Sequence, residues 1–559
     1  MPPKIRRWSR ALLMVAACTV AATTPPENGR AQVPPSAPPP GSETVPEAAA
    51  TRRGTAASAA SFPFLPGEVP HSVSLGDTST GRLVHGTRLE ESTALGILPK
   101  QEVRDYRWGT SELVGALAHA ASELHRQTGT RLWVGHLSRQ EGGDLPYSVS
   151  HNSGRDADIA FCYRDAEGKA VDPDDLIGVM GDGRTVRRGV YLDVGRTWRV
   201  IQALITYEGA RVQYLFMSRA IEGKLLIHAK ARGEPKALRE RAELLIHQPG
   251  RGAAKHHDHI HLRLHCSRDD VLAGCLDTGR EHPHASGYRR DRARFAMGLR
   301  RHLSSPDPDT RRRAVERIGL LGAKLLADVV VARLEDPSPE VRVAAVVTLA
   351  RFGEERHLAA ARRWLSAQPP SARLVAAERL GRLDMPGAGE LLAHLVDRAD
   401  AEAGALIDLV GPSRHLVAIP ALIRRLADPD RALRNRAARA LGRLTGHRYV
   451  ADYQRLSGHT LEMQRQKWRN AWAAGRTLTR RAWLMRGFHR AGFEVGRLEP
   501  EDAWGLVAAL SGPEHVAANA DERLRELFGR GGSCAFYKEW LGARRAAFDL
   551  PLAPPHLCR

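Results

Sequence analysis

The sequence of 559 residues lacks long apolar runs. No segment reaches the roughly 18 consecutive apolar residues that a membrane-spanning helix needs, and the apolar run near the N-terminus is short. Acidic residues are fewer than basic ones: the chain has 63 Asp and Glu and 83 Lys and Arg, which gives a formal net charge of +20. The first absence excludes a transmembrane span in the body of the chain. The second predicts attraction to anionic partners, with solvated Arg-rich faces as the alternative.

Aromatic residues make up only 6% of the chain, but the overall composition is that of a folded protein. The hydrophobic fraction of 43% and the charged fraction of 26% are close to globular averages, so disorder should be local. A single hydrophobic core stops growing at about 250 to 300 residues. At least two domains are therefore expected.

The N-terminus has the pattern of a secretory signal peptide, which we assign to residues 1–23. Four basic residues precede a short apolar run at residues 11–17: Lys4, Arg6, Arg7 and Arg10. The segment that ends at Cys18 resembles a bacterial lipobox, in which the cysteine is lipidated. Cleavage after Ala22 or Ala31 would instead release a soluble periplasmic protein, and an N-terminal helix of the folded domain is a further alternative. We expect export to the periplasm, membrane attachment only through Cys18, and no nucleic-acid partner.

The first half of the chain divides into a linker and a mixed domain. Residues 24–61 are rich in Pro, Ala and Ser and are interpreted as a tether. Residues 62–285 combine a helical apolar spacing over 112–127 with a strand pattern over 131–137. We therefore predict an α+β domain with an antiparallel sheet.

The second half is predicted to be an all-α solenoid. Over residues 290–447, Asp-Pro pairs at Asp307, Asp336 and Asp428 recur at one and three periods of about 31 residues. Each pair is expected to cap a helix, with proline in the first turn. These units resemble bacterial HEAT-like repeats, and an ordinary helical bundle is the alternative. A solenoid offers an extended surface, so we expect an unidentified protein partner there.

Residues 448–559 are predicted to be a further helical segment, to which the sequence assigns no function. Its tryptophans Trp468, Trp472 and Trp483 have helix-compatible spacing, which favours packing at the end of the solenoid over a ligand-binding role.

Only six cysteines occur in the chain, and in an oxidising compartment they are expected to form disulfides. Cys266 and Cys275 close a short loop and are expected to pair. Cys534 and Cys558 could form a second bridge, although sequence alone does not fix connectivity.

Two stretches of the α+β domain carry residues that suit a metal. His151 and Asp158 are seven residues apart, with Gly154 allowing a turn between them. His259 and His261 are two residues apart and would share one face of a strand. A zinc peptidase needs three protein ligands and an open fourth position for water. We therefore predict His151, Asp158 and His261 as ligands of Zn²⁺. Each residue alone is a weak indication of a metal site, and only the combination is specific.

Together with further blocks between residues 72 and 275, these stretches resemble the penicillin-insensitive murein endopeptidases. The blocks are Ser72-Val73-Ser74-Leu75-Gly76, Val134-Gly135-His136-Leu137-Ser138, Asp193-Val194-Gly195-Arg196-Thr197-Trp198, Val212-Gln213-Tyr214-Leu215-Phe216 and His247-Gln248-Pro249-Gly250. The family belongs to the wider group of lysostaphin-type and D-Ala-D-Ala zinc peptidases. The sequence departs from the family pattern at Ser148, where some members have histidine, and at Asn152-Ser153-Gly154.

The resemblance implies hydrolysis of the D-alanyl to meso-diaminopimelyl cross-link between peptidoglycan stem peptides, without sensitivity to penicillin. It places zinc on His151, Asp158 and His261 and makes His256 and His259 active-site histidines. We expect His259 to act as general base, and His256 to stabilise the oxyanion or to protonate the leaving amine. Asp258 either orients a histidine or is simply exposed.

Two other functions stay open at this point. The first is a catalytically inactive scaffold that binds peptidoglycan and works through the repeats. The second is a zinc D-Ala-D-Ala carboxypeptidase. Because every candidate residue lies before position 266, we expect the chain beyond 290 to be dispensable for cutting isolated muropeptides.

Overall fold

The computed structural model describes residues 62–250, 254–279 and 286–558. The predicted signal peptide, Cys18 and the linker 24–61 lie outside these residues. Within the described part of the chain, no helix combines the length and the apolar character needed to cross a bilayer.

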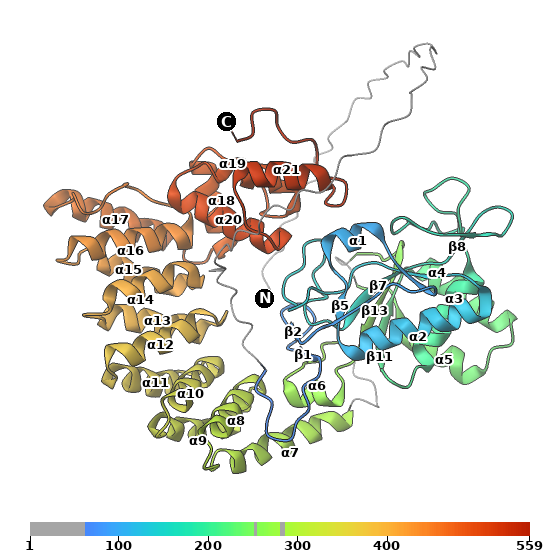
Figure 1. Ribbon diagram of the computed structural model, residues 1–559, viewed down its shortest axis with the longest axis horizontal. Helices are drawn as coiled ribbons and strands as arrows, with labels where there is room; N and C mark the ends of the chain where they lie inside the picture. The colour runs from blue at the N-terminus through green and yellow to red at the C-terminus, as the bar shows by residue number, and fades with distance from the viewer. Residues whose placement is uncertain (1–61, 251–253, 280–285, 559) are drawn as a thin grey trace, which may run out of the picture. The chain divides into compact units, whose positions relative to one another are not determined.

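A six-stranded sheet forms the centre of the N-terminal domain (Figure 1). Its strands, in spatial order, are β12 (Ile246–His247), β11 (Val212–Phe216), β13 (His259–Leu264), β7 (Asp156–Ala160), β6 (Leu132–Val134) and β4 (Leu95–Ile97). The three central pairings are antiparallel, as predicted, whereas the outer pairs β11–β12 and β4–β6 are parallel. The regular strand ends at Val134, earlier than the range 131–137 that the sequence predicts. The Gly135 amide and the His136 carbonyl oxygen still hydrogen-bond to the backbone of Asp158 in β7, at 2.7 and 2.8 Å.

The two central strands divide polar from apolar residues by simple alternation. In β7 and β13, His261 pairs with Asp158, and Ile260 pairs with Ile159. Successive side chains point to opposite faces of a strand, so the histidine and the aspartate share one face. The isoleucines share the other face and are fully buried.

Helices pack on the apolar face of this sheet. The helices of the domain are α1 (Pro99–Arg104), α2 (Ser111–Thr128), α3 (Val194–Thr206), α4 (Arg219–Ala231), α5 (Lys236–Leu245) and α6 (Arg268–Ala273). Leu117 of α2 and Ile201 of α3 belong to the same buried cluster as Ile159 and Ile260. At about 25 cal/mol per Å² of buried apolar surface, this packing dominates the stability of the domain. The polar face of the strands is thereby left for the site.

Short strand pairs surround the central sheet. They are β1 (Val73–Leu75) with β2 (Arg82–Val84), β3 (Thr87–Arg88) with β5 (Trp108–Gly109), and β8 (Tyr163–Arg164) with β9 (Ala170–Val171) and β10 (Tyr191–Leu192). The first residues of the domain do not stay within it. Leu65 packs into the core of the helical repeat, and Glu68 pairs with Arg317 of that repeat at 3.1 Å.

From residue 286 onward the described chain is helical, as the sequence predicts. The repeat helices are α7 (Ser286–His302), α8 (Pro308–Leu320), α9 (Ala327–Ala332), α10 (Pro339–Phe352), α11 (Glu355–Ala367), α12 (Pro370–Gly381), α13 (Pro386–Arg398), α14 (Ala403–Val410), α15 (Ile419–Arg425) and α16 (Arg431–Thr445). They share one continuous hydrophobic core, as stacked repeats do. Small residues such as Ala437 and Ala438 are fully buried in it.

The predicted caps hold at one Asp-Pro pair and are wrong at two. Asp307 caps α8, and its carboxylate accepts from the Thr310 amide at 2.8 Å. At the second pair Ser338 is the cap, and Asp336 forms an ion pair with Arg311 instead. Asp430 likewise replaces Asp428 as the cap of α16. In both cases the cap lies two positions after the predicted aspartate, so the helix begins later.

The C-terminal segment forms five more helices. They are α17 (Gly458–Gly475), α18 (Arg480–Arg490), α19 (Ala503–Ala509), α20 (Glu514–Phe528) and α21 (Cys534–Arg544). Trp468 and Trp483 are buried, and the Trp468 indole donates to the Tyr453 hydroxyl at 3.0 Å. These tryptophans are packing residues, as the spacing predicts. A disulfide joins Cys534 to Cys558.

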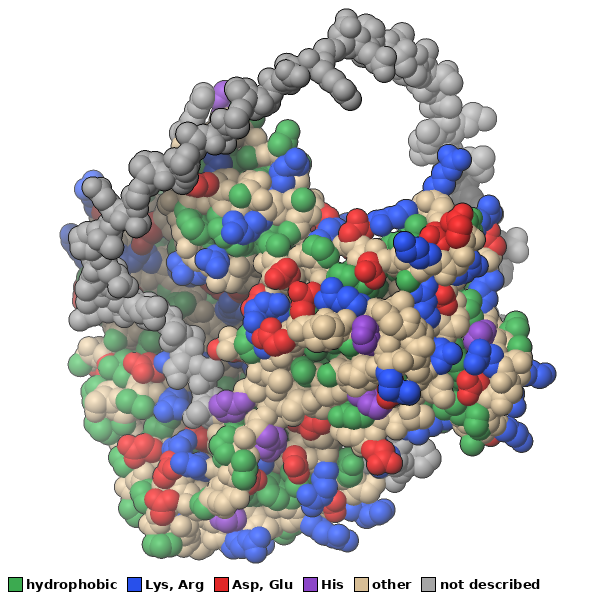
Figure 2. All heavy atoms as spheres, turned by 45° about the vertical axis from the view of Figure 1, so that its right-hand side comes forward, with side chains coloured by type: hydrophobic (Ala, Val, Ile, Leu, Met, Phe, Trp, Pro, Cys, Tyr) green, Lys and Arg blue, Asp and Glu red, His purple; other side chains and the backbone are tan. Residues whose placement is uncertain are grey.

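Positive and negative side chains are mixed on the surface and do not form separate charged patches on the visible face. Figure 2 shows Lys and Arg side chains interspersed with Asp and Glu over the visible face. Many arginines of the repeat are neutralised locally; Arg424, for example, pairs with Asp397. The net positive charge therefore gives no single basic patch on this face.

Candidate metal centre

Three side chains from two strands and a turn converge on one point. Asp158 and His261 lie opposite each other on β7 and β13, and their Oδ1 and Nδ1 atoms are 3.0 Å apart. His151 enters from the preceding turn with a left-handed φ of 76°, and its Nε2 lies 3.4 Å from the same Oδ1. Gly154, where the sequence predicts a turn, has a φ of +73°. The structure thus brings together the three predicted ligands.

The donor atoms of this group fit a metal ion. All three residues are buried, and their ligand atoms lie within 4.8 Å of one another. His151 Nε2 and Asp158 Oδ1 are buried without a hydrogen-bond partner, and buried polar atoms are normally satisfied. Two imidazoles and one carboxylate form the donor set of a catalytic zinc site. The orphaned atoms are those that a cation would satisfy.

A second group of three histidines overlaps the first. His256, His259 and His261 also offer ligand atoms within 4.8 Å of one another. This group contains no anionic ligand, and both nitrogens of His259 already face carboxylates. We therefore favour the set with Asp158, in which the carboxylate offsets part of the charge of the cation.

His259 lies between two acids. Its Nε2 is 3.2 Å from Asp158 Oδ1, and its Nδ1 is 2.8 Å from Asp258 Oδ1. Burial lowers the pKa of His259, but the two carboxylates outweigh that effect and raise the pKa to about 10. Of the two alternatives for Asp258, the geometry matches the one in which it orients a histidine.

His256 has the opposite electrostatic character. Burial and the neighbouring His261 and His259 lower its pKa to about 4, so it is neutral at pH 7. Its Nδ1 lies 2.8 Å from the Ala254 carbonyl oxygen. A carbonyl only accepts, so the proton is on Nδ1 and the lone pair of Nε2 is free to face the site. A neutral ring in this tautomer is a poor proton donor to a leaving amine.

Asp156 was not singled out from the sequence, yet it holds two of the predicted ligands in place. Its carboxylate forms a two-pronged ion pair with Arg263 at 2.9 and 2.8 Å. The same group accepts from the His151 amide at 3.3 Å and faces His261 Nε2 at 3.4 Å. Burial raises the pKa of Asp156, but Arg263 and His261 outweigh it and hold the pKa well below its usual range. Alternation along β7 places it two residues before Asp158, which is the signal that could have revealed it.

His136 is a second residue that the sequence did not single out as part of the site. It follows β6, and its Nδ1 lies 3.3 Å from Asp158 Oδ2. On its other side, Nε2 receives a hydrogen bond from Arg104 Nη1 at 3.0 Å. The contact is between residues 22 positions apart, and no local pattern announces it.

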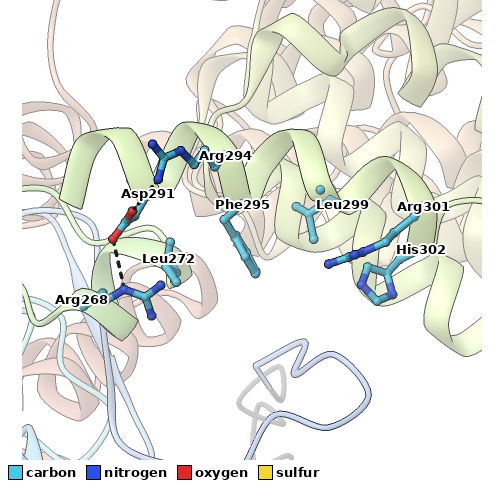
Figure 3. A pocket seen from close by; sticks show the side chains of 9 residues that line it. Arg268, Leu272, Asp291, Arg294, Phe295, Leu299, Arg301 and His302 are labelled. Atoms are coloured by element: carbon cyan, nitrogen blue, oxygen red, sulfur yellow. Dashed lines mark hydrogen bonds and ion pairs between the residues drawn. The ribbon is translucent and has the colours of Figure 1, made fainter. Parts of the chain in front are cut away.

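Two other features of the structure, a disulfide and a surface hollow, lie outside the candidate metal centre. A disulfide joins Cys266 to Cys275 beyond the end of β13. A surface hollow lies between α6 and α7 (Figure 3), where Arg268 and Asp291 form an ion pair at 3.2 Å. None of the predicted ligands lines this hollow, so it is not the candidate catalytic centre.

Comparisons with known proteins agree with this geometry. Residues 74–296 match the family model of the penicillin-insensitive murein endopeptidases, and residues 296–380 and 327–409 match HEAT repeats. No curated protein matches the chain. The matched regions follow each other in the order that the sequence predicts, and both predicted resemblances are confirmed.

Solved structures add only weak likenesses. The CpcE–CpcF complex of the phycocyanin lyase from Nostoc is 19% identical, with 45% of this chain and 90% of that chain covered at a TM-score of 0.22. The Pds5–Scc1 complex is 11% identical, with 50% and 45% covered at a TM-score of 0.21. An engineered protein is 13% identical, with 60% and 85% covered at a TM-score of 0.21. No argument rests on scores this low. The family matches carry the conclusion: residues 74–296 match the model of the penicillin-insensitive murein endopeptidase family, and HEAT repeats follow them in the same chain.

Proposed function

We propose that the N-terminal domain is a zinc-dependent peptidoglycan hydrolase that cuts the D-alanyl to meso-diaminopimelyl cross-link between stem peptides. One observation carries the proposal: His151, Asp158 and His261 converge with orphaned donor atoms inside a domain of the murein endopeptidase family. The family is defined by its action on murein, and the donor set is that of a catalytic zinc site.

The residues of the chain divide the work. His151, Asp158 and His261 would hold the cation. Bound zinc supplies a polarised carbonyl and an acidified water in sites of this kind. His259, held by Asp258 at 2.8 Å, would act as the base that takes up a proton during hydrolysis. His256, as a neutral ring with Nδ1 bonded to the backbone, is better suited to accept a hydrogen bond from substrate than to protonate the leaving amine.

We further propose that the protein is exported to the periplasm. The basic and apolar N-terminal pattern supports export, and two disulfides, Cys266–Cys275 and Cys534–Cys558, suit an oxidising compartment. Lipidation at Cys18 remains the proposed means of membrane attachment. The HEAT repeats are the proposed docking surface for a protein partner.

The proposal is tested on purified muropeptide dimers. The full chain should convert dimers to monomers, a chelator should stop the reaction, and stoichiometric Zn²⁺ should restore it. The variant Asp397→Ala, which removes an ion pair in the repeat, serves as the control and should behave as wild type. Release of terminal D-alanine without loss of dimers would instead establish a carboxypeptidase. No product of either kind from a zinc-loaded chain would favour the inactive scaffold.

A further inference from the structure

Asp158 uses its two oxygens for different purposes. Oδ1 faces the three histidine nitrogens of the candidate metal centre, at 3.4 Å from His151, 3.2 Å from His259 and 3.0 Å from His261. Oδ2 points the other way and lies 3.3 Å from His136 Nδ1. A carboxylate with one oxygen held from behind is restrained to present the other oxygen to a cation.

The polarity of the contact with His136 follows from its other neighbour. Arg104 Nη1 lies 3.0 Å from His136 Nε2, and a guanidinium can only donate. Nε2 therefore accepts, the ring carries its proton on Nδ1, and that proton is donated to Asp158 Oδ2. The side chains of Arg104 and His136 are only 3% and 11% exposed, so water does not compete strongly for either contact.

Arg104 is held in turn by a loop from the far end of the chain, residues 547–549, which we call the docking loop. The Arg104 guanidinium donates to the Ala547 carbonyl oxygen at 2.7 Å and to Asp549 Oδ2 at 3.2 Å. It lies 4.0 Å over the ring of Tyr147, whose hydroxyl donates to the Phe548 carbonyl oxygen at 3.2 Å.

The docking loop is itself well anchored. Phe548 is 3% exposed and packs against Phe528, with ring centroids 5.0 Å apart. The disulfide between Cys534 and Cys558 closes the segment that contains the loop. Arg104 therefore meets a fixed partner rather than a loose end of the chain.

We propose that Arg104 and His136 are positioning residues for Asp158, and that the docking loop holds their outer end. The inference rests on the proposed metal centre and adds a part of the chain to it. Groups that orient a metal ligand through hydrogen bonds typically contribute about 10-fold to 100-fold to metal affinity or activity. Here the line of contacts runs from Asp549 through Arg104 and His136 to the carboxylate that faces the cation.

The test of the inner contact compares three full-length proteins: wild type, His136→Ala and His136→Asn. Asparagine can place an amide N–H where Nδ1 lies, so it restores the donor to Asp158 without the ring. Zinc affinity is measured by competition with a chromophoric chelator, which needs no activity, and kcat/KM is measured on muropeptide dimers. We expect His136→Ala to weaken zinc binding by about 10-fold or more and His136→Asn to recover most of the loss.

Melting temperatures of the metal-free proteins show whether each variant is folded, and His136→Asn decides the question if His136→Ala unfolds. Equal zinc affinity in wild type and in a folded His136→Ala overturns the positioning role, as does His136→Asn failing to exceed alanine. A wild-type chain that binds no zinc contradicts the proposed function itself, so the two failures are distinguishable.

The test of the docking loop uses charge reversal. Asp549→Lys places a cation beside Arg104, whereas the matched control Asp397→Lys does the same beside Arg424 in the repeat. Like charges at a contact repel strongly enough to displace a loop. We expect Asp549→Lys to weaken zinc binding by at least about threefold and the control to stay within about twofold. Equal affinities in the two variants would remove the docking loop from the proposal.

Discussion

At the scale of single residues, His259 shows how the site depends on its cation. Asp158 and Asp258 outweigh burial and raise the pKa of His259 to about 10, so the metal-free ring is protonated at neutral pH. A cation bound to Asp158 offsets the negative charge that holds this proton. On the proposed assignment of the metal centre, a bound cation would therefore favour loss of this proton and leave His259 able to act as a base.

The two histidines of β13 should separate metal binding from turnover. His259→Ala should keep zinc and lose activity by about 100-fold to 10,000-fold, because a base that is not a ligand affects only proton transfer. His261→Ala should lose zinc and activity together, because His261 belongs to both candidate ligand groups. Bound zinc is measured by elemental analysis and the rate on muropeptide dimers.

The opposite pattern has a definite meaning. If His259→Ala loses zinc as completely as His261→Ala, the three-histidine group is the metal centre and Asp158 has another role. Asp258→Asn is the intermediate control, since it removes one of the two charges on His259 and leaves all candidate ligands in place.

Much of the site is predictable from local sequence, because strand alternation alone places His259 and His261 on one face. The pairing of His261 with Asp158 follows once β7 and β13 are neighbours. The roles of Asp156 and His136 are not predictable in this way, since each depends on a partner in another element. Sequence spacing shows which residues share one face of a strand, but it does not show which residues of another strand or helix they contact.

At the scale of elements, helix α6 contains a carboxyl group in an unusual state. Asp270 is 2% exposed, and its Oδ1 accepts from the Ser74 amide at 2.7 Å. Burial, with a smaller contribution from Glu112, raises the pKa of Asp270 to about 7. The folded state therefore binds a proton between about pH 4 and pH 7 that the unfolded chain releases.

This raised pKa predicts a dependence of stability on pH. The contribution of Asp270 to the free energy of unfolding is most favourable below about pH 4, falls as pH rises to about 7, and is level above that. Asp270→Asn stays neutral and keeps an oxygen for the Ser74 amide. We expect it to raise the melting temperature by roughly 2 to 8 °C at pH 8, and by less at pH 5.

The comparison is made by calorimetry on the metal-free chain, with Asp269→Asn as the exposed neighbour that should change little. A larger gain at pH 5 than at pH 8 would contradict the assigned protonation state.

The elements themselves were predictable to different degrees. The helix expected over 112–127 is α2, longer by one residue at each end, because apolar spacing and the cap at Thr110 agree. At Asp336 and Asp428 the helix begins two residues later than the pattern predicts, with Ser338 and Asp430 as the caps, although Asp309 stands in the same position after Asp307. Local propensity allows both starts, and the ion pair of Asp336 with Arg311 uses the aspartate elsewhere.

At the scale of the whole chain, the docking loop changes what is expected of an isolated domain. Sequence alone predicts that a fragment of residues 62–285 would cut muropeptides as well as the full chain. That fragment keeps every candidate ligand but loses the contacts of Arg104 with Ala547 and Asp549. We expect it to fold, to bind zinc at least about threefold more weakly, and to cut dimers more slowly.

Zinc competition and dimer cleavage on the two proteins check this expectation. The full-length Asp549→Lys variant is the control, and it should resemble the fragment in zinc affinity. A fragment that equals the full chain in both measurements would restore the simpler view. This long-range contact could not be predicted from the sequence, because no periodicity links residues 445 positions apart.

The separation between Arg104 and Asp549 also sets an order of events in biosynthesis. Chains grow at about 5 to 20 residues per second, so the ribosome completes Asp549 roughly 20 to 90 s after Arg104. If the docking loop positions Asp158 as we propose, full zinc affinity depends on a segment that is made long after the metal ligands. The N-terminal domain then reaches that affinity only once the far end of the same molecule has folded against it.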